Sequence, residues 1–265
     1  MLKVGIVGLG LIGGSILKGL AQFDYEIYAI SKSSAQSAKT WCTFSSDILE
    51  DVENCDIIFA CSPMRKTPKI LEKLEKIVKK DTIVCDVCSL KGFLDKKYNF
   101  NYIGTHPMAG TENSGFDSSF DGLFKGAKWV ISKKNDVLEE IIKTLGAKPI
   151  LMNSKEHDLA AAQISHLPML ISFALFHSTK TNEAKTLASS GFRDTTRLSM
   201  TNEILACDML ELNAQNIDKC LDEFISSINY LKNLSADEKI EVLKNLAQKR
   251  AELYDKNGKN CFGDK

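Results

Sequence analysis

The sequence has no excess charge of either sign and no long apolar run. Its 265 residues carry 34 lysines and arginines against 34 aspartates and glutamates, so the formal net charge is zero. Nucleic acids and anionic membranes attract proteins with a basic excess, so we expect neither as a partner. The balance leaves room for small anionic ligands in a local pocket. No run reaches the roughly 18 uninterrupted apolar residues of a membrane span, and segment 160–176 contains polar residues that favour a buried helix.

The sequence also lacks an export signal and a disulfide framework. Met1 leads directly into a strand-like segment, without the basic flank, apolar stretch and cleavage site of a leader. Eight cysteines without framework spacing are typical of reduced thiols, so we expect a cytoplasmic protein. Cys85 and Cys88 form a CxxC pair, but a zinc site needs two further ligands nearby. We therefore interpret the pair as packing residues and expect no metal.

Short apolar runs alternate with helix-like segments over residues 1–152. The pattern predicts strands over 2–7, 26–30, 56–61, 82–87, 101–105, 127–132 and 148–152, with helices over 13–23, 66–79 and 136–145. Strands that alternate with helices indicate an α/β fold, here a doubly wound parallel sheet with helices on both faces. The apolar segment 57–61 is typical of a strand that is buried on both sides.

The pattern becomes all-helical after Met152. Asn153 with Glu156, and Ser235 with Glu238, have the spacing of capping boxes that begin helices. Apolar residues recur at helical spacing over 217–231 and 240–253. We therefore predict two domains, a dinucleotide-binding domain over 1–152 and a helical domain over 153–265. So many apolar stripes in a small helical unit favour a homodimer that forms through the C-terminal helices.

A glycine-rich turn follows the first predicted strand. Gly8, Gly10 and Gly13 form a GxGxxG motif that opens an amphipathic helix, which is the context of a Rossmann-type dinucleotide site. Gly8 permits a tight turn, Gly10 lets a pyrophosphate approach the backbone, and Gly13 allows close packing of helix and strand. The motif predicts NAD or NADP as cofactor. The further residues that we expect to contact it are Leu11, Ile12, Ser31, Lys32 and Ser62.

The end of the second predicted strand leaves the choice of cofactor open. An acidic residue at this point commonly binds the adenosine ribose of NAD. Here the strand ends in Ser31-Lys32-Ser33-Ser34, which has no carboxylate. Hydroxyls and a lysine suit the 2′-phosphate of NADP, whereas a solvated loop would bind NAD less selectively.

Polar residues follow two neighbouring strands of the predicted sheet. Ligands bind beyond the carboxyl ends of such strands, where segments 86–91 and 105–112 are expected to lie. His106 is the candidate general base, because the imidazole pKa lies close to neutrality. Ser89 is expected to share a hydrogen bond with His106 or to orient the substrate.

Several of these segments together resemble the prephenate dehydrogenase family. They are the glycine motif with Gly14 and Ser15, Asp-Val-Cys-Ser-Leu-Lys at 86–91, His-Pro-Met-Ala-Gly-Thr-Glu-Asn-Ser-Gly at 106–115, His157-Asp158, Ser-His-Leu-Pro at 165–168, and Ser-Gly-Phe-Arg-Asp-Thr-Thr-Arg at 190–197. The resemblance runs in order from Lys3 to about Asn213. The segments that begin at His106 and Gly191 are far more specific than the glycine motif.

The resemblance implies an oxidative decarboxylation of prephenate to 4-hydroxyphenylpyruvate, on the route to tyrosine. It assigns His106 to accept the hydroxyl proton, Ser89 to support it, and Arg197 to bind a substrate carboxylate. The remaining substrate-binding residues that we expect are Thr111, Glu112, Ser165 and Arg193. A guanidinium suits a carboxylate better than an ammonium does. For Arg193, an ion pair with Asp194 is an equally good interpretation.

The chain departs from the family pattern at two positions. Met169 stands where the family often has a histidine, and Ala206 where it commonly has tryptophan. Arogenate, the amino counterpart of prephenate, therefore stays an alternative substrate. We interpret His166 as structural, and His157 beside Asp158 as a hinge or helix-start contact.

Two other function classes share some of these features. One is another two-domain NAD(P)-dependent dehydrogenase or imine reductase, which would not require His106 and Arg197 together. The other is a nucleotide-sensing binding protein without catalysis, against which Ser89, His106 and Arg197 argue. We expect no separate regulatory domain in a sequence of this length, so we expect any feedback by tyrosine to act at the active site.

Overall fold

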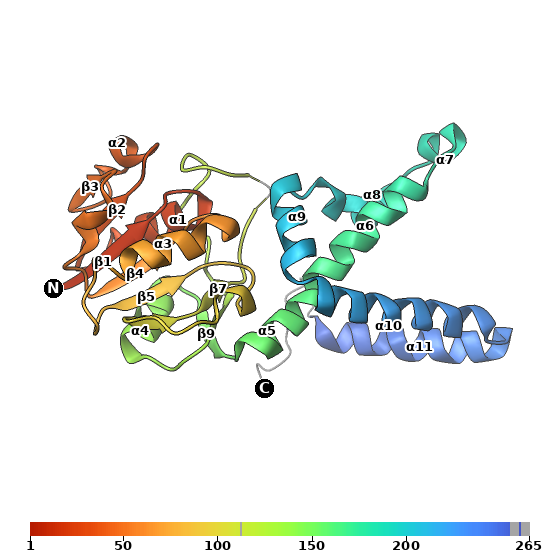
Figure 1. Ribbon diagram of the computed structural model, residues 1–265. Coiled ribbons are helices and arrows are strands. Elements are labelled where there is room, and N and C mark those ends of the chain that lie inside the picture. The colour runs from red at the N-terminus through yellow and green to blue at the C-terminus, as the bar shows by residue number, and fades with distance from the viewer. Residues whose placement is uncertain (112, 255–259, 261–265) are drawn as a thin grey trace. The chain divides into compact units, whose positions relative to one another are not determined.

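Six parallel strands form the main sheet of the protein. The structure is a computed structural model, and it describes residues 1–111, 113–254 and 260. The strand order is β3-β2-β1-β4-β5-β6 (Figure 1). The bounds are β1 Leu2–Val7, β2 Tyr25–Ile30, β3 Phe44–Ser46, β4 Ile57–Ala60, β5 Ile83–Asp86 and β6 Asn101–Ile103. This order confirms the predicted doubly wound, Rossmann-type fold. The order reverses between β1 and β4, and ligands bind at such a switch point.

The side chains of the main sheet alternate between two hydrophobic clusters. In β4, Ile57 and Phe59 join one cluster, whereas Ile58 and Ala60 join the other. Helix α1 (Leu11–Leu20) contributes Leu17 to the first cluster. Helix α3 (Thr67–Leu74) contributes to the second. Both faces of the sheet are therefore covered, which explains the uninterrupted apolar character of its central strands.

The last three strands of this half form a second sheet, in the order β7-β8-β9. They are β7 Thr105–Pro107, β8 Lys128–Ile131 and β9 Lys148–Leu151, with helix α4 (Asp136–Thr144) between the last two. The prediction of one strand over 101–105 is wrong, because the chain leaves the main sheet after β6 and enters the second sheet at Thr105. There the main-chain N–H of Thr105 donates to Asp86 (3.2 Å), and β7 pairs antiparallel to β8.

One continuous helical stretch, Ser154–Ser178, follows the sheets. It comprises α5 (Ser154–Ala161), a π-helical turn (Ala162–His166) and α6 (Leu167–Ser178). Pro168 has no N–H to donate back along the helix, and the wider turn lies just before it. By length and composition alone the stretch could cross a membrane, with one third of its most apolar window buried. Its buried polar residues, among them His157 and His166, favour a place in the interior of the fold.

Further helices complete the chain. They are α2 (Ala35–Ala38), α7 (Asn182–Thr186), α8 (Ser190–Thr196), α9 (Glu203–Leu212), α10 (Ala214–Asn233) and α11 (Ala236–Leu253), with short 3₁₀ turns over Leu49–Val52, Met64–Lys66, Gly92–Leu94 and Arg197–Met200. Helix α9 packs against the nucleotide-binding half. Met209 contacts its second cluster, and Arg65 forms ion pairs with Asp208 and Glu211.

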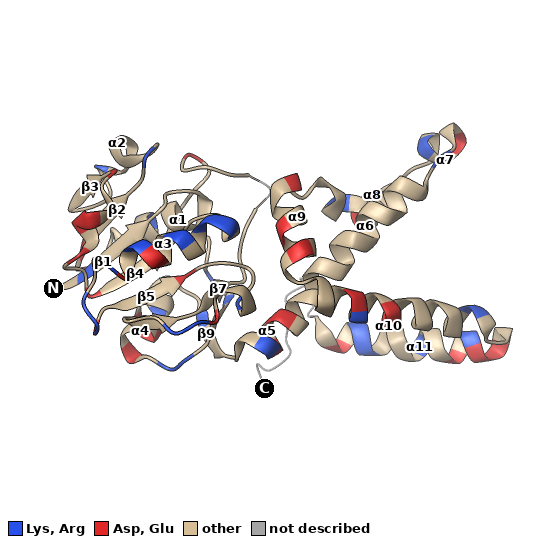
Figure 2. Ribbon diagram, viewed as in Figure 1, with Lys and Arg blue, Asp and Glu red and all other residues tan. Residues whose placement is uncertain are grey.

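The chain divides into two compact units, Met1–Ile217 and Asp218–Lys265. In the second unit, α11 begins with a complete capping box between Ser235 and Glu238, as predicted. Both helices of this unit carry charges of both signs along their length, whereas α6 has none (Figure 2). Several apolar side chains of the second unit are exposed, among them Ile225, Ile228, Ile240 and Leu243.

Candidate active site

The glycine motif forms the turn between β1 and α1. Gly8 has a φ of +96°, and a Cβ there would lie 2.5 Å from the main-chain oxygen of Cys61. A Cβ on Gly13 would lie 2.0 Å from the main-chain oxygen of Gly8. A Cβ on Gly10 would meet nothing within 4 Å. Gly8 and Gly13 are therefore required by packing, whereas the open space at Gly10 suits a ligand.

The start of α1 fits a pyrophosphate. Leu11 and Ile12 form the first turn of the helix, which has no acidic residue and no side-chain cap on its N–H groups. Free N–H groups at a helix N-terminus bind anions. The residues present at this turn therefore fit the dinucleotide that the motif predicts.

A cavity of about 780 Å³ adjoins this turn. Its lining includes Gly8, Ser31, Lys32 and Ser62, which are four of the residues predicted to contact the cofactor. A second cavity of about 330 Å³ continues at the end of β2, and Lys39 and Asp47 line it together with Ser31 and Lys32. Lys39 and Asp47 were not among the predicted residues, because they follow α2 and β3, two short elements that the sequence pattern does not predict.

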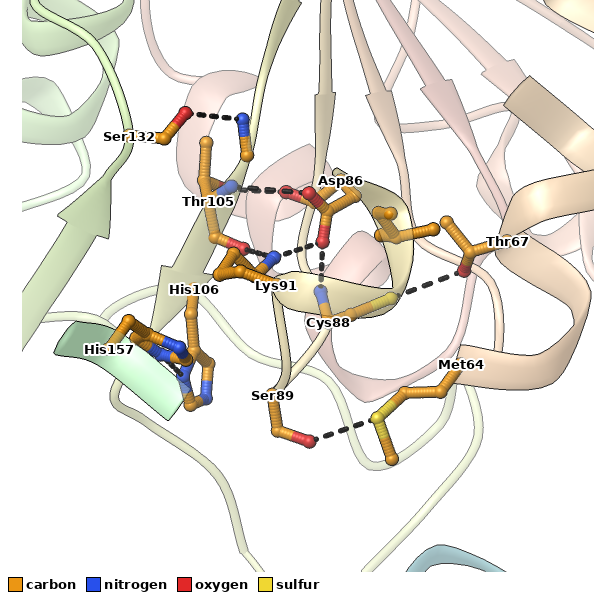
Figure 3. Close-up of polar contacts among 12 residues, drawn as sticks. Met64, Thr67, Asp86, Cys88, Ser89, Lys91, Thr105, His106, Ser132 and His157 are labelled. Atoms are coloured by element: carbon orange, nitrogen blue, oxygen red, sulfur yellow. Dashed lines mark hydrogen bonds and ion pairs between the residues drawn. The ribbon is translucent and has the colours of Figure 1, made fainter. Parts of the chain in front are cut away.

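A network of buried charged residues holds the end of β5 and the beginning of β7 together. Asp86 is fully buried and forms an ion pair with the ammonium of Lys91. Its carboxylate also accepts hydrogen bonds from Cys88 N (2.7 Å) and Tyr102 Oη (2.7 Å). The Lys91 ammonium donates in turn to the main-chain oxygen of Thr105. These bonds fix the segment that precedes His106 (Figure 3).

His106 lies in β7 beside a second histidine. Its Nδ1 lies 2.9 Å from Nε2 of His157, which comes from α5, and the two rings meet edge to face (Figure 3). The Nδ1 of His157 lies 2.8 Å from Oδ1 of Asp158. The prediction of a hinge or helix-start role for His157 missed this contact between rings. The His-Asp pair within the family resemblance was the available signal.

The environment of His106 favours its neutral form. Burial lowers the pKa of His106 well below its usual value, and the positive charge of Lys91, with His157 and His166, lowers it further. His106 therefore has a free pair of electrons at neutral pH and can accept a proton. His166 itself is buried, and its Nδ1 accepts a hydrogen bond from Asn213 Nδ2 (3.2 Å), which is a packing role.

Ser89 lies in the same loop as Lys91, and its hydroxyl donates to Sδ of Met64 (3.2 Å) (Figure 3). The described hydrogen bonds of His106 do not include Ser89. Of the two roles expected for Ser89, a shared hydrogen bond with His106 is thus absent here. Orientation of the substrate stays a prediction.

The predicted substrate-binding residues lie outside this hydrogen-bonded group. Arg197 begins the 3₁₀ turn after α8 and is exposed, and Arg193 donates to the carboxylate of Asp194 (2.8 Å), as its alternative interpretation expected. Thr111 is exposed and its hydroxyl accepts from Asn113 N (3.2 Å). Ser165 is half-buried in the π-helical turn. Glu112 lies outside the described residues.

Two family models together match most of the chain, from residue 21 to residue 249. "Prephenate dehydrogenase, nucleotide-binding domain" matches residues 21–151, and "Prephenate dehydrogenase, dimerization domain" matches residues 153–249. The chain belongs to the prephenate dehydrogenase family. It is therefore an oxidoreductase with an NAD(P)-binding domain, as the glycine motif predicted.

Individual members of the family resemble nearly the whole chain. The prephenate dehydrogenase of Lactococcus lactis is 29% identical over 94% of this chain and 77% of its own length. The structure of prephenate dehydrogenase from Aquifex aeolicus with hydroxyphenyl propionate and NAD+ is 30% identical, with a TM-score of 0.85 over 95% of this chain and 98% of its own. The Synechocystis arogenate dehydrogenase structure is 30% identical, with a TM-score of 0.83 over 94% and 97%.

Proposed function

We propose that this member of the prephenate dehydrogenase family oxidises and decarboxylates prephenate, with His106 as the general base. The observation that supports His106 is its neutral imidazole in β7, which the contact with His157 anchors. The base accepts the proton of the ring hydroxyl as hydride leaves the carbon that bears it. Carbon dioxide leaves from the opposite ring carbon, and the ring becomes aromatic. The ring oxygen takes back a proton as the ring becomes aromatic, so the products are 4-hydroxyphenylpyruvate, carbon dioxide and a reduced cofactor.

The cofactor supplies the hydride acceptor when it is bound. We assign its pyrophosphate to Gly10 and to the first turn of α1, where space is open and N–H groups are uncapped. Its adenosine half is assigned to the cavity that Ser31, Lys32 and Ser62 line.

We further propose that the enzyme accepts NADP as well as NAD. The cavity at the end of β2 contains Lys32 and Lys39 together with several serine hydroxyls. Two ammonium groups and hydroxyls suit a 2′-phosphate. Asp47 lines the same cavity and opposes an anion, so the phosphate needs both lysines to outweigh it.

Substrate recognition is assigned to residues that stay predictions. Arg193 forms an ion pair with Asp194, whereas Arg197 is exposed and is not part of that pair. We therefore assign the substrate carboxylate to Arg197 rather than to Arg193. Ser89, Thr111, Glu112 and Ser165 complete the proposed set. Arogenate is the alternative substrate, because Met169 and Ala206 are both buried and apolar and give no polar contact that would select prephenate.

We also propose that the enzyme is a homodimer in the cytoplasm. The boundary between its two domains is proposed to lie between residues 152 and 153. Exposed apolar side chains on α9, α10 and α11 support the dimer, among them Ile204, Ile225 and Ile240. The name of the second family model, a dimerization domain, supports it too.

A matrix assay tests the proposed function. Prephenate and arogenate are each combined with NAD and NADP, and the absorbance of the reduced nicotinamide is followed. We expect turnover of prephenate with at least one cofactor. Turnover of arogenate alone would replace the substrate, and no turnover in any combination would refute the proposed function.

A further inference from the structure

Three side chains form a hydrogen-bonded series that ends at the proposed base. Asp158 Oδ1 lies 2.8 Å from Nδ1 of His157, and Nε2 of His157 lies 2.9 Å from Nδ1 of His106. His157 is 3% exposed and Asp158 is 8% exposed, so water competes little for these bonds. Both ring nitrogens of His157 therefore take part in the series, whereas His106 takes part through Nδ1 alone.

Asp158 is fixed from several sides. Its carboxylate accepts hydrogen bonds from the main-chain N–H groups of Lys91 (2.9 Å) and Gly92 (2.7 Å). Its main-chain oxygen accepts from Asn213 Nδ2 (2.8 Å). Burial raises the pKa of Asp158, but hydrogen bonds from His157, Gly92 and Lys91 outweigh burial and leave the pKa lowered. The carboxylate is thus an anion that only accepts hydrogen bonds.

The directions of the bonds follow from this acceptor. A carboxylate accepts, so His157 Nδ1 must carry a proton and donate it. When His157 is neutral, its Nε2 carries no proton and accepts from His106. His106 consequently donates from Nδ1, and its unshared electron pair is at Nε2.

We propose that His157 and Asp158 are positioning residues that hold His106 in the tautomer protonated at Nδ1, so that Nε2 is the atom that accepts the substrate proton. The assignment deepens the proposed function and rests on it for the role of His106. When Nε2 of His106 takes a proton, the Nδ1 bond to His157 persists, because both nitrogens then donate.

The series also compensates an unfavourable charge. The titratable groups that face His106 are Lys91, His157 and His166, and the ammonium of Lys91 disfavours a positive imidazole. Asp86 offsets Lys91 by a direct ion pair. Asp158 is a second negative charge, and its hydrogen bond is to His157 rather than to His106.

The tautomer can be observed without turnover. The chain has four histidines, at positions 106, 157, 166 and 177. Two-bond ¹H–¹⁵N spectra of protein with ¹⁵N-labelled histidine distinguish Nδ1–H from Nε2–H rings. His177→Gln and His106→Gln remove one set of signals each and thereby assign the spectrum. We expect Nδ1–H for His106 in the wild-type protein, and Nε2–H would overturn the proposal even if prephenate were turned over.

A pair of variants tests the positioning role. His157→Phe removes the acceptor, whereas the amide of His157→Gln reaches about as far as the imidazole Nε2 and can still accept. We expect kcat to fall about 10²- to 10³-fold in the Phe variant, as for other losses in acid–base groups, and less than about 10-fold in the Gln variant. The KM for the cofactor should stay unchanged in both. Equal losses of kcat in the two variants would contradict the proposal.

The outcomes separate this inference from the proposed function. Failure of the wild-type protein in the matrix assay would refute the function and leave the tautomer measurement intact. Normal turnover with a His106 ring protonated at Nε2 would refute the positioning role alone. If the Phe variant does not fold, the wild-type spectrum and the Gln variant still decide.

Discussion

Gly13 approaches Gly8 so closely that a Cβ on Gly13 would lie 2.0 Å from the main-chain oxygen of Gly8. Because this contact is with backbone, it cannot be relieved by a rotamer change. We expect Gly13→Ala to destabilise the domain and to abolish binding of NAD(P). Thermal unfolding and fluorescence titration with NAD would measure the two effects.

Gly10→Ala is the matched control for the glycine motif. A Cβ on Gly10 meets nothing within 4 Å, so the fold should keep its thermal midpoint. Affinity for NAD should still fall, because the new methyl group occupies the space assigned to the pyrophosphate. Unchanged affinity in this variant would place the cofactor elsewhere.

His106→Asn should lower kcat by about 10²- to 10⁴-fold, because the general base is lost. Cofactor affinity should not change, since His106 is absent from the lining of the cofactor cavities. Steady-state rates and a titration with NAD are the measurements. Near-normal turnover would remove His106 from the mechanism.

The main sheet was largely predictable from the sequence, because strands buried on two faces are continuous apolar runs. Strand β3 was missed, since three residues, Phe44–Ser46, carry no periodicity. The prediction of one strand over 101–105 failed for a different reason. A side chain distant in sequence, Asp86, fixes the place where the chain changes sheets.

The site was predictable in its residue types more than in its contacts. His106 and the glycine motif follow from their places at strand ends. The contact of His157 with His106 depends on how α5 packs against β7, and local sequence does not encode that distance. The π-helical turn has one local signal, Pro168, which does not by itself predict a wider turn.

Arg197→Ala should raise the KM for prephenate about 30-fold or more, because a carboxylate loses its guanidinium partner. Arg193→Ala is the control, since Arg193 already pairs with Asp194 on the surface. We expect less than about a threefold change there. Equal effects of the two variants on KM would contradict the assignment of Arg197.

Lys32→Ala should weaken NADP more than NAD, because only NADP carries the 2′-phosphate. The dissociation constants of both cofactors, measured at one salt concentration, give the ratio. Lys39→Ala should act in the same direction, because Lys39 lines the same cavity. Parallel loss of affinity for both cofactors would show that these lysines do not select the phosphate.

Stability should fall between pH 6.5 and pH 4. Burial lowers the pKa of His166 to about 4, and the folded His106 is also held neutral. The unfolded chain binds these protons at about pH 6.5, so it binds more protons than the folded chain below that pH. The stabilisation is complete above pH 6.5 and is lost as the pH falls. His166 alone should account for about 2 kcal/mol between pH 7 and pH 5.

Urea unfolding at pH 7 and pH 5 measures this loss. His166→Gln should show a smaller difference between the two pH values, whereas His177→Gln, at an exposed position, should behave as the wild-type protein. An undiminished pH difference in His166→Gln would contradict the assignment.

The π-helical turn at Ala162–His166 sets the rotation of α6 about the helix axis relative to α5. Each residue of a helix turns the chain by about 100°, so one deletion there would rotate α6 by about that angle relative to α5. His157 would keep its place beside His106, while Met169 and Ser172, both now buried, would swing away from their neighbours. The number of residues between Asp158 and Pro168 must therefore stay fixed for a working fold, and this stretch should tolerate substitutions far better than changes in length.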